Sequence, residues 1–262
     1  NDSDPQALAA CRASSLAARR FRWPAGLALT NDGLLVCNDD PSVTLYKFAK
    51  DGSMDELATV PKHAVHYRGF RRCAVHQQTQ RTYASGDDAE GDQALVLLDA
   101  NLQVVATVEA TGDIPEDIDD DYEPIRDVAV HGDQVIVLTS DSHDKGSGLQ
   151  LLDLDGRFVR TIAAGEFVNP QAAAVSHGRA FVIDDDVDGD EDDDDDDNDD
   201  EDQSGKIGKV LHVIDIQSGD IIQRVHVDLL VGEVTAILAD DDEIYIASYS
   251  KVVVLRYAGS EA

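Results

Sequence analysis

The amino-acid sequence predicts an all-β protein, a β-propeller of about five four-stranded blades. Short runs rich in β-branched residues alternate with turn-forming residues, and helical periodicity is almost absent. A short apolar strand centred on an alanine recurs five times, at Ala28, Ala74, Ala129, Ala174 and Ala236. Two of the four spacings are 45 and 46 residues, and the two longer ones contain a polar loop and an acidic insertion. A period of about 45 residues is the length of a four-stranded propeller blade.

Each repeat is expected to contribute its strands in the same order, with a tight turn after the first. The expected alanine strands are residues 26–29, 72–75, 127–130, 172–175 and 234–237. The second strands are residues 34–37, 81–84, 135–138, 180–183 and 244–247. The third strands are residues 43–48, 94–98, 149–154, 210–216 and 252–257. The fourth strands are residues 54–60, 103–108, 157–162 and 220–227, and the fifth repeat reaches Ala262 without one.

The N-terminal segment, residues 1–22, precedes a propeller of residues 23–262. A propeller often completes its last blade with a strand from the other terminus, so we expect residues 14–22 to supply a closing strand. An alanine-rich helix over residues 7–18 is the alternative, and a truncated chain that lacks a sixth blade is a third. The first residue is Asn1 rather than Met, which indicates either a removed signal or pro-segment or a piece of a longer protein. We favour an extracellular or lumenal location after signal removal.

The formal net charge is -32, from 53 acidic and 21 basic residues. Sixteen of the acids lie within residues 184–202, part of an acidic insertion over residues 184–205, and the other 37 still outnumber the bases. This charge argues against binding to nucleic acid or to anionic membranes, because both are polyanions. No apolar run approaches 18 residues, so no membrane insertion is expected. Outside the insertion the composition, rich in Asp and poor in Lys, also resembles adaptation to high salt.

The junction between the third and fourth repeats, residues 156–184, reads GRFVRTIAAGEFVNPQAAAVSHGRAFVID. It resembles the NHL repeat, and the first repeat, WPAGLAL followed by DGLLV, is similar to it as well. The resemblance implies a propeller, commonly of six blades, where five can be counted here. It also implies a scaffold that binds proteins or other ligands, although some relatives are calcium-dependent lactonases or metal-dependent lyases. No catalytic motif of the family can be placed on this sequence.

The repeat places most of the surplus aspartate in loops at one end of the blades. One group of these loops joins the second and third strands, and the other leads into the next alanine strand. The first group comprises residues 38–42, 85–93, 140–148, 184–205 and 248–251, and the second includes residues 62–67, 111–124, 165–170 and 228–233. Such an acidic loop face is expected to bind cations or a protein partner with a basic surface, and the chain could belong to a larger assembly. A purely solubilising surface is the alternative.

The start of the acidic insertion matches the pattern of a calcium-binding loop, in which alternating oxygen ligands surround a glycine. The glycine is Gly189, and the five candidate ligands are Asp184, Asp186, Asp188, Asp190 and Asp195. Alternating aspartates are nearly guaranteed in so acidic a stretch, so only the glycine is informative. The sequence therefore leaves three possibilities open: an ordered Ca²⁺ site, a delocalised atmosphere of Ca²⁺ or Mg²⁺, and a metal-free insertion without fixed structure.

Several polar residues lie where the chain enters the alanine strands and are expected to line the central channel. These candidate ligand residues are Arg71, Glu123, Arg126, Asp127, Asn169 and Glu233, together with Trp23, Arg68 and Gln171. They could hold an ion or an anionic small molecule, or pair with one another across blades. Three imidazoles, those of His63, His66 and His143, lie in or next to these loops and could bind zinc.

The three cysteines, Cys11, Cys37 and Cys73, form neither a disulfide framework nor a CxxC metal site. The last two fall within apolar strands, where buried thiols behave as small hydrophobic groups. At most one disulfide is possible.

The sequence shows no nucleophile with its base and no known catalytic motif. It therefore favours a non-catalytic binding scaffold that uses the acidic loop face, with calcium as a possible accessory. The alternative is a divalent-metal-dependent lyase or lactonase-like hydrolase acting in the central channel.

Overall fold

The computed structural model describes twelve segments of the chain, all between Pro24 and Arg256. They are residues 24–31, 33–38, 42–48, 54–60, 69–87, 93–109, 125–140, 147–186, 208–227, 234–240, 243–248 and 251–256. The predicted closing strand or helix of residues 1–22 and most of the acidic insertion lie outside them. Among the described residues, no helix is long and apolar enough to span a membrane.

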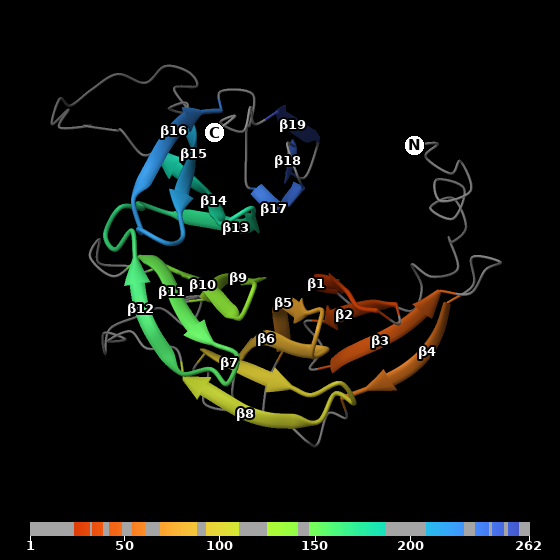
Figure 1. The fold of residues 1–262 in the computed structure, drawn as a ribbon. Coiled ribbons are helices and arrows are strands. Elements are labelled where there is room, and N and C mark those ends of the chain that lie inside the picture. Colours follow the sequence, from red (N-terminus) through yellow and green to blue (C-terminus); the bar gives the residue numbers. More distant parts are fainter. Residues whose placement is uncertain are drawn as a thin grey trace, which may run out of the picture. The chain divides into compact units, whose positions relative to one another are not determined.

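The described residues form nineteen strands in five antiparallel sheets, each following chain order (Figure 1). The first sheet contains β1 (Pro24–Leu29), β2 (Leu34–Asn38), β3 (Ser42–Phe48) and β4 (Met54–Thr59). The second contains β5 (Gly69–His76), β6 (Arg81–Asp87), β7 (Gln93–Leu98) and β8 (Val104–Glu109). The third contains β9 (Ile125–His131), β10 (Gln134–Thr139), β11 (Gly148–Asp153) and β12 (Phe158–Ile162). The fourth contains β13 (Pro170–Ser176), β14 (Arg179–Asp186), β15 (Gly208–Asp215) and β16 (Ile221–His226). The fifth contains β17 (Val234–Asp240), β18 (Glu243–Ser248) and β19 (Val252–Arg256).

This arrangement confirms the predicted fold class, including four strands in each of the first four repeats. Burial follows the position of a strand in its sheet. Every residue of the third strand β7 is buried, and so is almost all of the second strand β10. The fourth strands β12 and β16 are largely exposed. Strands covered on both faces read as continuous apolar runs, which explains why the middle strands stand out in the sequence.

A β-bulge interrupts the start of the first strands β1, β5, β13 and β17. One extra residue lies between Pro24 and Gly26, between Pro170 and Ala172, and between Val234 and Ala236, and β5 has the same irregularity after Phe70. Bulges turn a strand locally and re-aim its side chains. The side chains at the start of these four strands therefore point in directions that differ from those in a regular strand.

The bulges correct one detail of the predicted repeat. Ala28, Ala74 and Ala174 occupy matching positions, opposite Leu35, Tyr83 and Phe181 of the second strand. In the fifth sheet that position, opposite Tyr245, belongs to Leu238, and Ala236 lies two residues earlier, directly after the bulge. Both positions face the same side because a strand alternates with a period of two.

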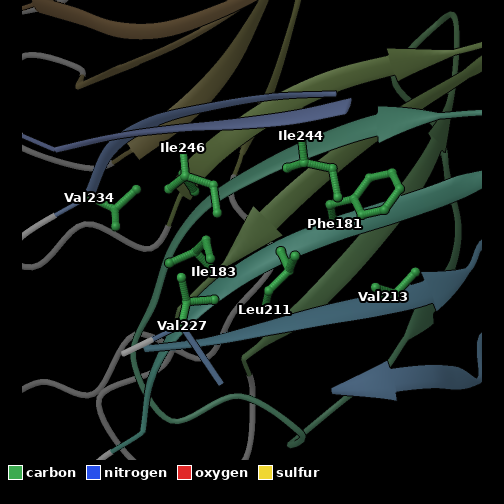
Figure 2. Close-up of a cluster of buried hydrophobic side chains, with 9 residues drawn as sticks. Phe181, Ile183, Leu211, Val213, Val227, Val234, Ile244 and Ile246 are labelled. Carbon is green, nitrogen blue, oxygen red and sulfur yellow. The ribbon is translucent and has the colours of Figure 1, made fainter. Parts of the chain in front are cut away.

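The chain divides into two compact units, residues 1–137 with 151–159, and residues 138–150 with 160–262. In the first unit one apolar cluster packs around Leu35, Phe70 and Val96, and a second around Tyr83, Leu97 and Val137. In the second unit the core joins β14 and β15 to β17 and β18, with the members Ala172, Phe181, Ile183, Leu211, Val213, Val227, Val234, Ile244 and Ile246 (Figure 2). This last core lies directly beside the strands from which the acidic insertion departs.

Candidate functional site

The best-defined group of charged side chains lies at the root of the acidic insertion, in the second unit. It comprises Asp184 and Asp185 of β14, Lys209 and His212 of β15, and Asn169 and Gln171 at the start of β13; we call it the buried polar cluster. The ladder of β14 and β15 continues through Asp185 opposite Lys209 to Asp186 opposite Gly208. The chain between these last two residues carries the rest of the insertion, so the cluster holds both of its ends.

Asp184 fixes the loop that leads into β13. The residue is only 2% exposed, and its two carboxylate oxygens accept hydrogen bonds from backbone amides. The Val168 amide donates to Oδ2 at 2.9 Å and the Asn169 amide to Oδ1 at 2.7 Å. Hydrogen bonds to a carboxylate are stronger than those between neutral groups, and they satisfy a charge that would otherwise be costly to bury.

Asp185 forms an ion pair with Lys209, which lies directly opposite on the neighbouring strand. The Lys209 ammonium contacts Oδ1, and the side chains retain only 5% and 12% of their exposure. The other oxygen, Oδ2, accepts hydrogen bonds from Asn169 Nδ2 at 3.0 Å and Gln171 Nε2 at 3.3 Å. A buried ion pair is tolerated when its remaining lone pairs find donors, and that condition is met here.

His212 extends the cluster toward solvent. Its Nε2 lies 3.6 Å from Asp184 Oδ2, and the edge of its ring meets Phe167 with centroids 5.3 Å apart. Arg224 Nε donates to His212 Nδ1 at 3.4 Å, and the same guanidinium pairs with Glu166 at 2.6 Å. Because Nδ1 accepts, the network assigns the proton of the neutral ring to Nε2, which faces the carboxylate.

The cluster is suited to holding the backbone in place. Its carboxylates are already engaged by amide and ammonium donors, and a further charged contact, at His212, leads outward through an exposed arginine. Among the described segments, no group of three or more His, Cys, Asp or Glu side chains is arranged to hold a metal ion. The cluster therefore fixes the loop before β13 against strands β14 and β15.

Of the five predicted calcium ligands, the structure describes Asp184, which belongs to the buried polar cluster, and Asp186. Asp184 lies within β14 with both carboxylate oxygens on backbone amides, and Asp186 ends the same strand. The other three candidates, Asp188, Asp190 and Asp195, lie outside the described residues, as do His63, His66 and His143. An ordered calcium site therefore stays a prediction.

Of the predicted channel residues, Asn169 and Gln171 belong to the cluster. Arg71, Arg126 and Asp127 lie at the starts of β5 and β9 in the first unit, whereas Glu123 and Glu233 lie outside the described residues. Asp127 accepts a hydrogen bond from the amide of the next residue at 2.8 Å.

Sequence reasoning missed Arg72, which ties together the first strands of three sheets in the first unit. Its Nε donates to the carbonyl of Arg126 at 3.1 Å, and one terminal nitrogen donates to the carbonyl of Ala25 at 3.3 Å. Its backbone amide donates to Ser85 Oγ at 3.1 Å. The signal was an arginine that begins an otherwise apolar strand.

Asp185, Lys209 and His212 were missed as well. Strand periodicity contained the signal for the ion pair, because Asp185 continues the face of Phe181 and Ile183, and Lys209 continues the face of Val213 and Leu211. Opposite charges at matching ends of two apolar faces indicate a cross-strand pair.

No protein-family model matches the chain, and no curated protein matches it. Solved structures do resemble it. The PQQ-bound aldose sugar dehydrogenase of Streptomyces coelicolor has a TM-score of 0.61 at 17% identity, covering 92% of this chain and 79% of that one. A chain of the nidogen/laminin complex has a TM-score of 0.54 at 10% identity, covering 90% and 76%. The hydrazine synthase of Kuenenia stuttgartiensis has a TM-score of 0.55 at 19% identity and covers 86% of this chain, which spans only 55% of that one.

These likenesses show the fold alone, because the identities are low. Together with the five antiparallel sheets, they place the chain among the β-propellers. The finer resemblance to the NHL repeat remains a prediction.

Proposed function

We propose that this β-propeller is a non-catalytic binding module that engages a basic protein surface through its acidic loop face. The observation that carries the proposal is the attachment of the acidic insertion. The insertion leaves β14 after Asp186 and returns to β15 at Gly208, and these two residues are the last pair of the ladder between the strands. The buried polar cluster anchors this end of the ladder. A dense negative charge is thereby presented from a fixed point on the fold.

Charge of this density acts at a distance. Sixteen acids without a base between residues 184 and 202 create a local potential that attracts cations and basic surfaces and raises the rate of encounter. Calcium is the accessory that the proposal includes, because carboxylate oxygens are its preferred ligands. Calcium would lower the repulsion among the carboxylates of the insertion.

The similar structures do not choose among functions. Their titles describe a PQQ-bound dehydrogenase, a hydrazine synthase and a protein complex, so the shared fold serves both catalysis and binding. The proposal therefore rests on the charge and its anchoring. A metal-dependent lyase or lactonase-like hydrolase is the competing outcome of the tests below.

The binding test compares three proteins: the wild type, a variant with the acids of residues 188–202 replaced by Asn and Gln, and a variant with residues 187–207 replaced by a short Gly-Ser linker. Both variants keep Asp185 and Lys209, so the anchor stays intact. Binding to cytochrome c, used as a basic protein probe, is measured by biolayer interferometry over a range of KCl. We expect the wild type to bind with a strong salt dependence and both variants to lose affinity by about tenfold or more. Equal binding by the neutralised variant would refute the use of the insertion.

The calcium test measures thermal melts of the same proteins with EDTA, CaCl₂, MgCl₂, and KCl at matched ionic strength. We expect CaCl₂ to raise the melting temperature of the wild type but not that of the neutralised variant. If KCl alone reproduces the rise in melting temperature, the acidity reflects salt adaptation and the protein has no specific calcium site. Metal-dependent turnover of lactone substrates by the wild type would overturn the non-catalytic assignment.

A further inference from the structure

Two free cysteines from different sheets meet in the core of the first unit. Cys37 lies on β2 and is fully buried, and Cys73 lies on β5 and is partly buried. Both belong to the apolar cluster around Leu35 and Phe70, and burial together with the neighbouring Cys73 thiol raises the pKa of Cys37. They are 36 residues apart in the sequence, so only the packing of the first sheet against the second brings them together.

Gly26 explains why the two thiols can approach. Gly26 and Cys37 are directly opposite one another on β1 and β2, so their side-chain directions share one face. A Cβ added at Gly26 would lie 2.9 Å from the carbonyl oxygen of Arg71 and 3.1 Å from the amide nitrogen of Cys73. The face of the first sheet that carries Cys37 therefore points at the start of β5, and the missing side chain of Gly26 lets that backbone come close.

We propose that Cys37 and Cys73 are a thiol pair that peroxide converts reversibly into a disulfide linking the first two sheets. The more accessible Cys73 attacks hydrogen peroxide as the thiolate, and cleavage of the O–O bond leaves a sulfenic acid on Cys73 and hydroxide, which takes up a proton to form water. The Cys37 thiol then attacks the Cys73 sulfur, forms the S–S bond and releases a second water. The two sulfurs together lose two electrons, and these reduce the peroxide. A dithiol reductant reverses the change by thiol–disulfide exchange.

This link would join the second strand of the first sheet to the first strand of the second sheet, beside the close backbone approach at Gly26. It closes a loop of more than thirty residues, and a cross-link of that span restricts the unfolded chain strongly. Reversible stabilisation of the first unit is the expected consequence.

The test uses the full chain with Cys11→Ser, which removes the one other thiol and lies outside the described residues. After treatment with hydrogen peroxide, intact mass spectrometry should show a loss of about 2 Da, and dithiothreitol should restore the mass. Peptide mapping without reduction should recover a peptide pair joined through Cys37 and Cys73. The oxidised protein should melt roughly 5–15 °C higher than the reduced protein.

The matched controls are Cys11→Ser with Cys37→Ser and Cys11→Ser with Cys73→Ser, in which the mass loss should vanish. Addition of one or more oxygens to Cys73 with no disulfide would overturn the proposal. A disulfide between two molecules in place of the internal one would overturn it as well. Because the mass measurement is made on a chain that keeps both thiols, the result stands even if either serine variant fails to fold.

Discussion

Replacing Lys209 by methionine tests the buried polar cluster directly. Methionine keeps most of the side-chain volume but leaves the Asp185 carboxylate buried without its ammonium partner. Breaking a buried ion pair by removing one partner costs about 3–5 kcal/mol. Asp185 keeps the amide donors of Asn169 and Gln171, at 3.0 and 3.3 Å, so we expect the lower end, about 3 kcal/mol. In a chain of this size that corresponds to a fall in melting temperature of roughly 6–12 °C.

The assay is urea denaturation followed by far-ultraviolet circular dichroism, with a thermal melt of the same samples. The matched control is Arg157→Met, because Arg157 also contacts a carboxylate, that of Asp153, but its side chain is 78% exposed. An exposed pair contributes about 0–1 kcal/mol, so this variant should remain close to the wild type.

The double variant Asp185→Asn with Lys209→Met completes a double-mutant cycle. Two neutral groups replace the ion pair, so we expect the double variant to be clearly more stable than the sum of the single changes implies. The reasoning would be refuted if Lys209→Met cost no more than Arg157→Met. Such a result would mean that the ion pair is solvated despite its burial.

Three further predictions concern the first unit. Gly26→Ala should destabilise the protein by about 1–3 kcal/mol in urea titrations, because its Cβ would press on the Arg71 carbonyl at 2.9 Å; unchanged stability would show that the strands can separate freely. The Arg81 guanidinium, 2.7 Å from Asp155, holds the pKa of that carboxyl below its ordinary 3.8. The ion pair therefore stabilises the fold above pH 3.8, and this stabilisation is lost as the pH falls through the lowered pKa of Asp155. Asp155→Asn should therefore be less stable than the wild type at neutral pH and converge with it in an acid titration, and a constant gap would contradict the assignment. Burial, with the neighbouring thiol, raises the pKa of Cys37, so iodoacetamide near pH 9 should label it in urea but not in the native chain; equal labelling would contradict its burial.

The fold could be predicted because blades impose a strong local pattern. The middle strands are covered on both faces and read as apolar runs, and the first strands need small residues where neighbouring sheets approach, as at Gly26. The position of the fifth alanine could not be predicted. The repeat pattern is satisfied by an alanine at either of two positions on the same face of the first strand. In the fifth sheet these positions are held by Ala236 and Leu238, and only the bulge after Val234 shows which of them matches the alanines of the other sheets.

The candidate site was predictable only in part. Asp184 and Asn169 were selected, but as a loop calcium ligand and a channel residue, because the sequence does not show where β14 ends. The strand continues to Asp186, so the first carboxylates of the acidic run lie in the ladder. Lys209 was missed because either of the two lysines that follow the acidic stretch, Lys206 and Lys209, reads as a solvated residue until the strand register places Lys209 opposite Asp185.

There is a physical reason why Asp185 and Lys209 form an ion pair at a buried position that two apolar residues could occupy. Well-packed apolar residues often replace a buried ion pair without loss of stability. Here, however, Oδ2 of Asp185 accepts hydrogen bonds from the side chains of Asn169 and Gln171, and an apolar residue would leave both amides without that acceptor. Both amides are only partly buried, so the loss of this acceptor would cost about 1 kcal/mol for each, the lower end of the range for an unsatisfied polar group. The carboxylate therefore fixes the start of β13 and the root of the acidic insertion together.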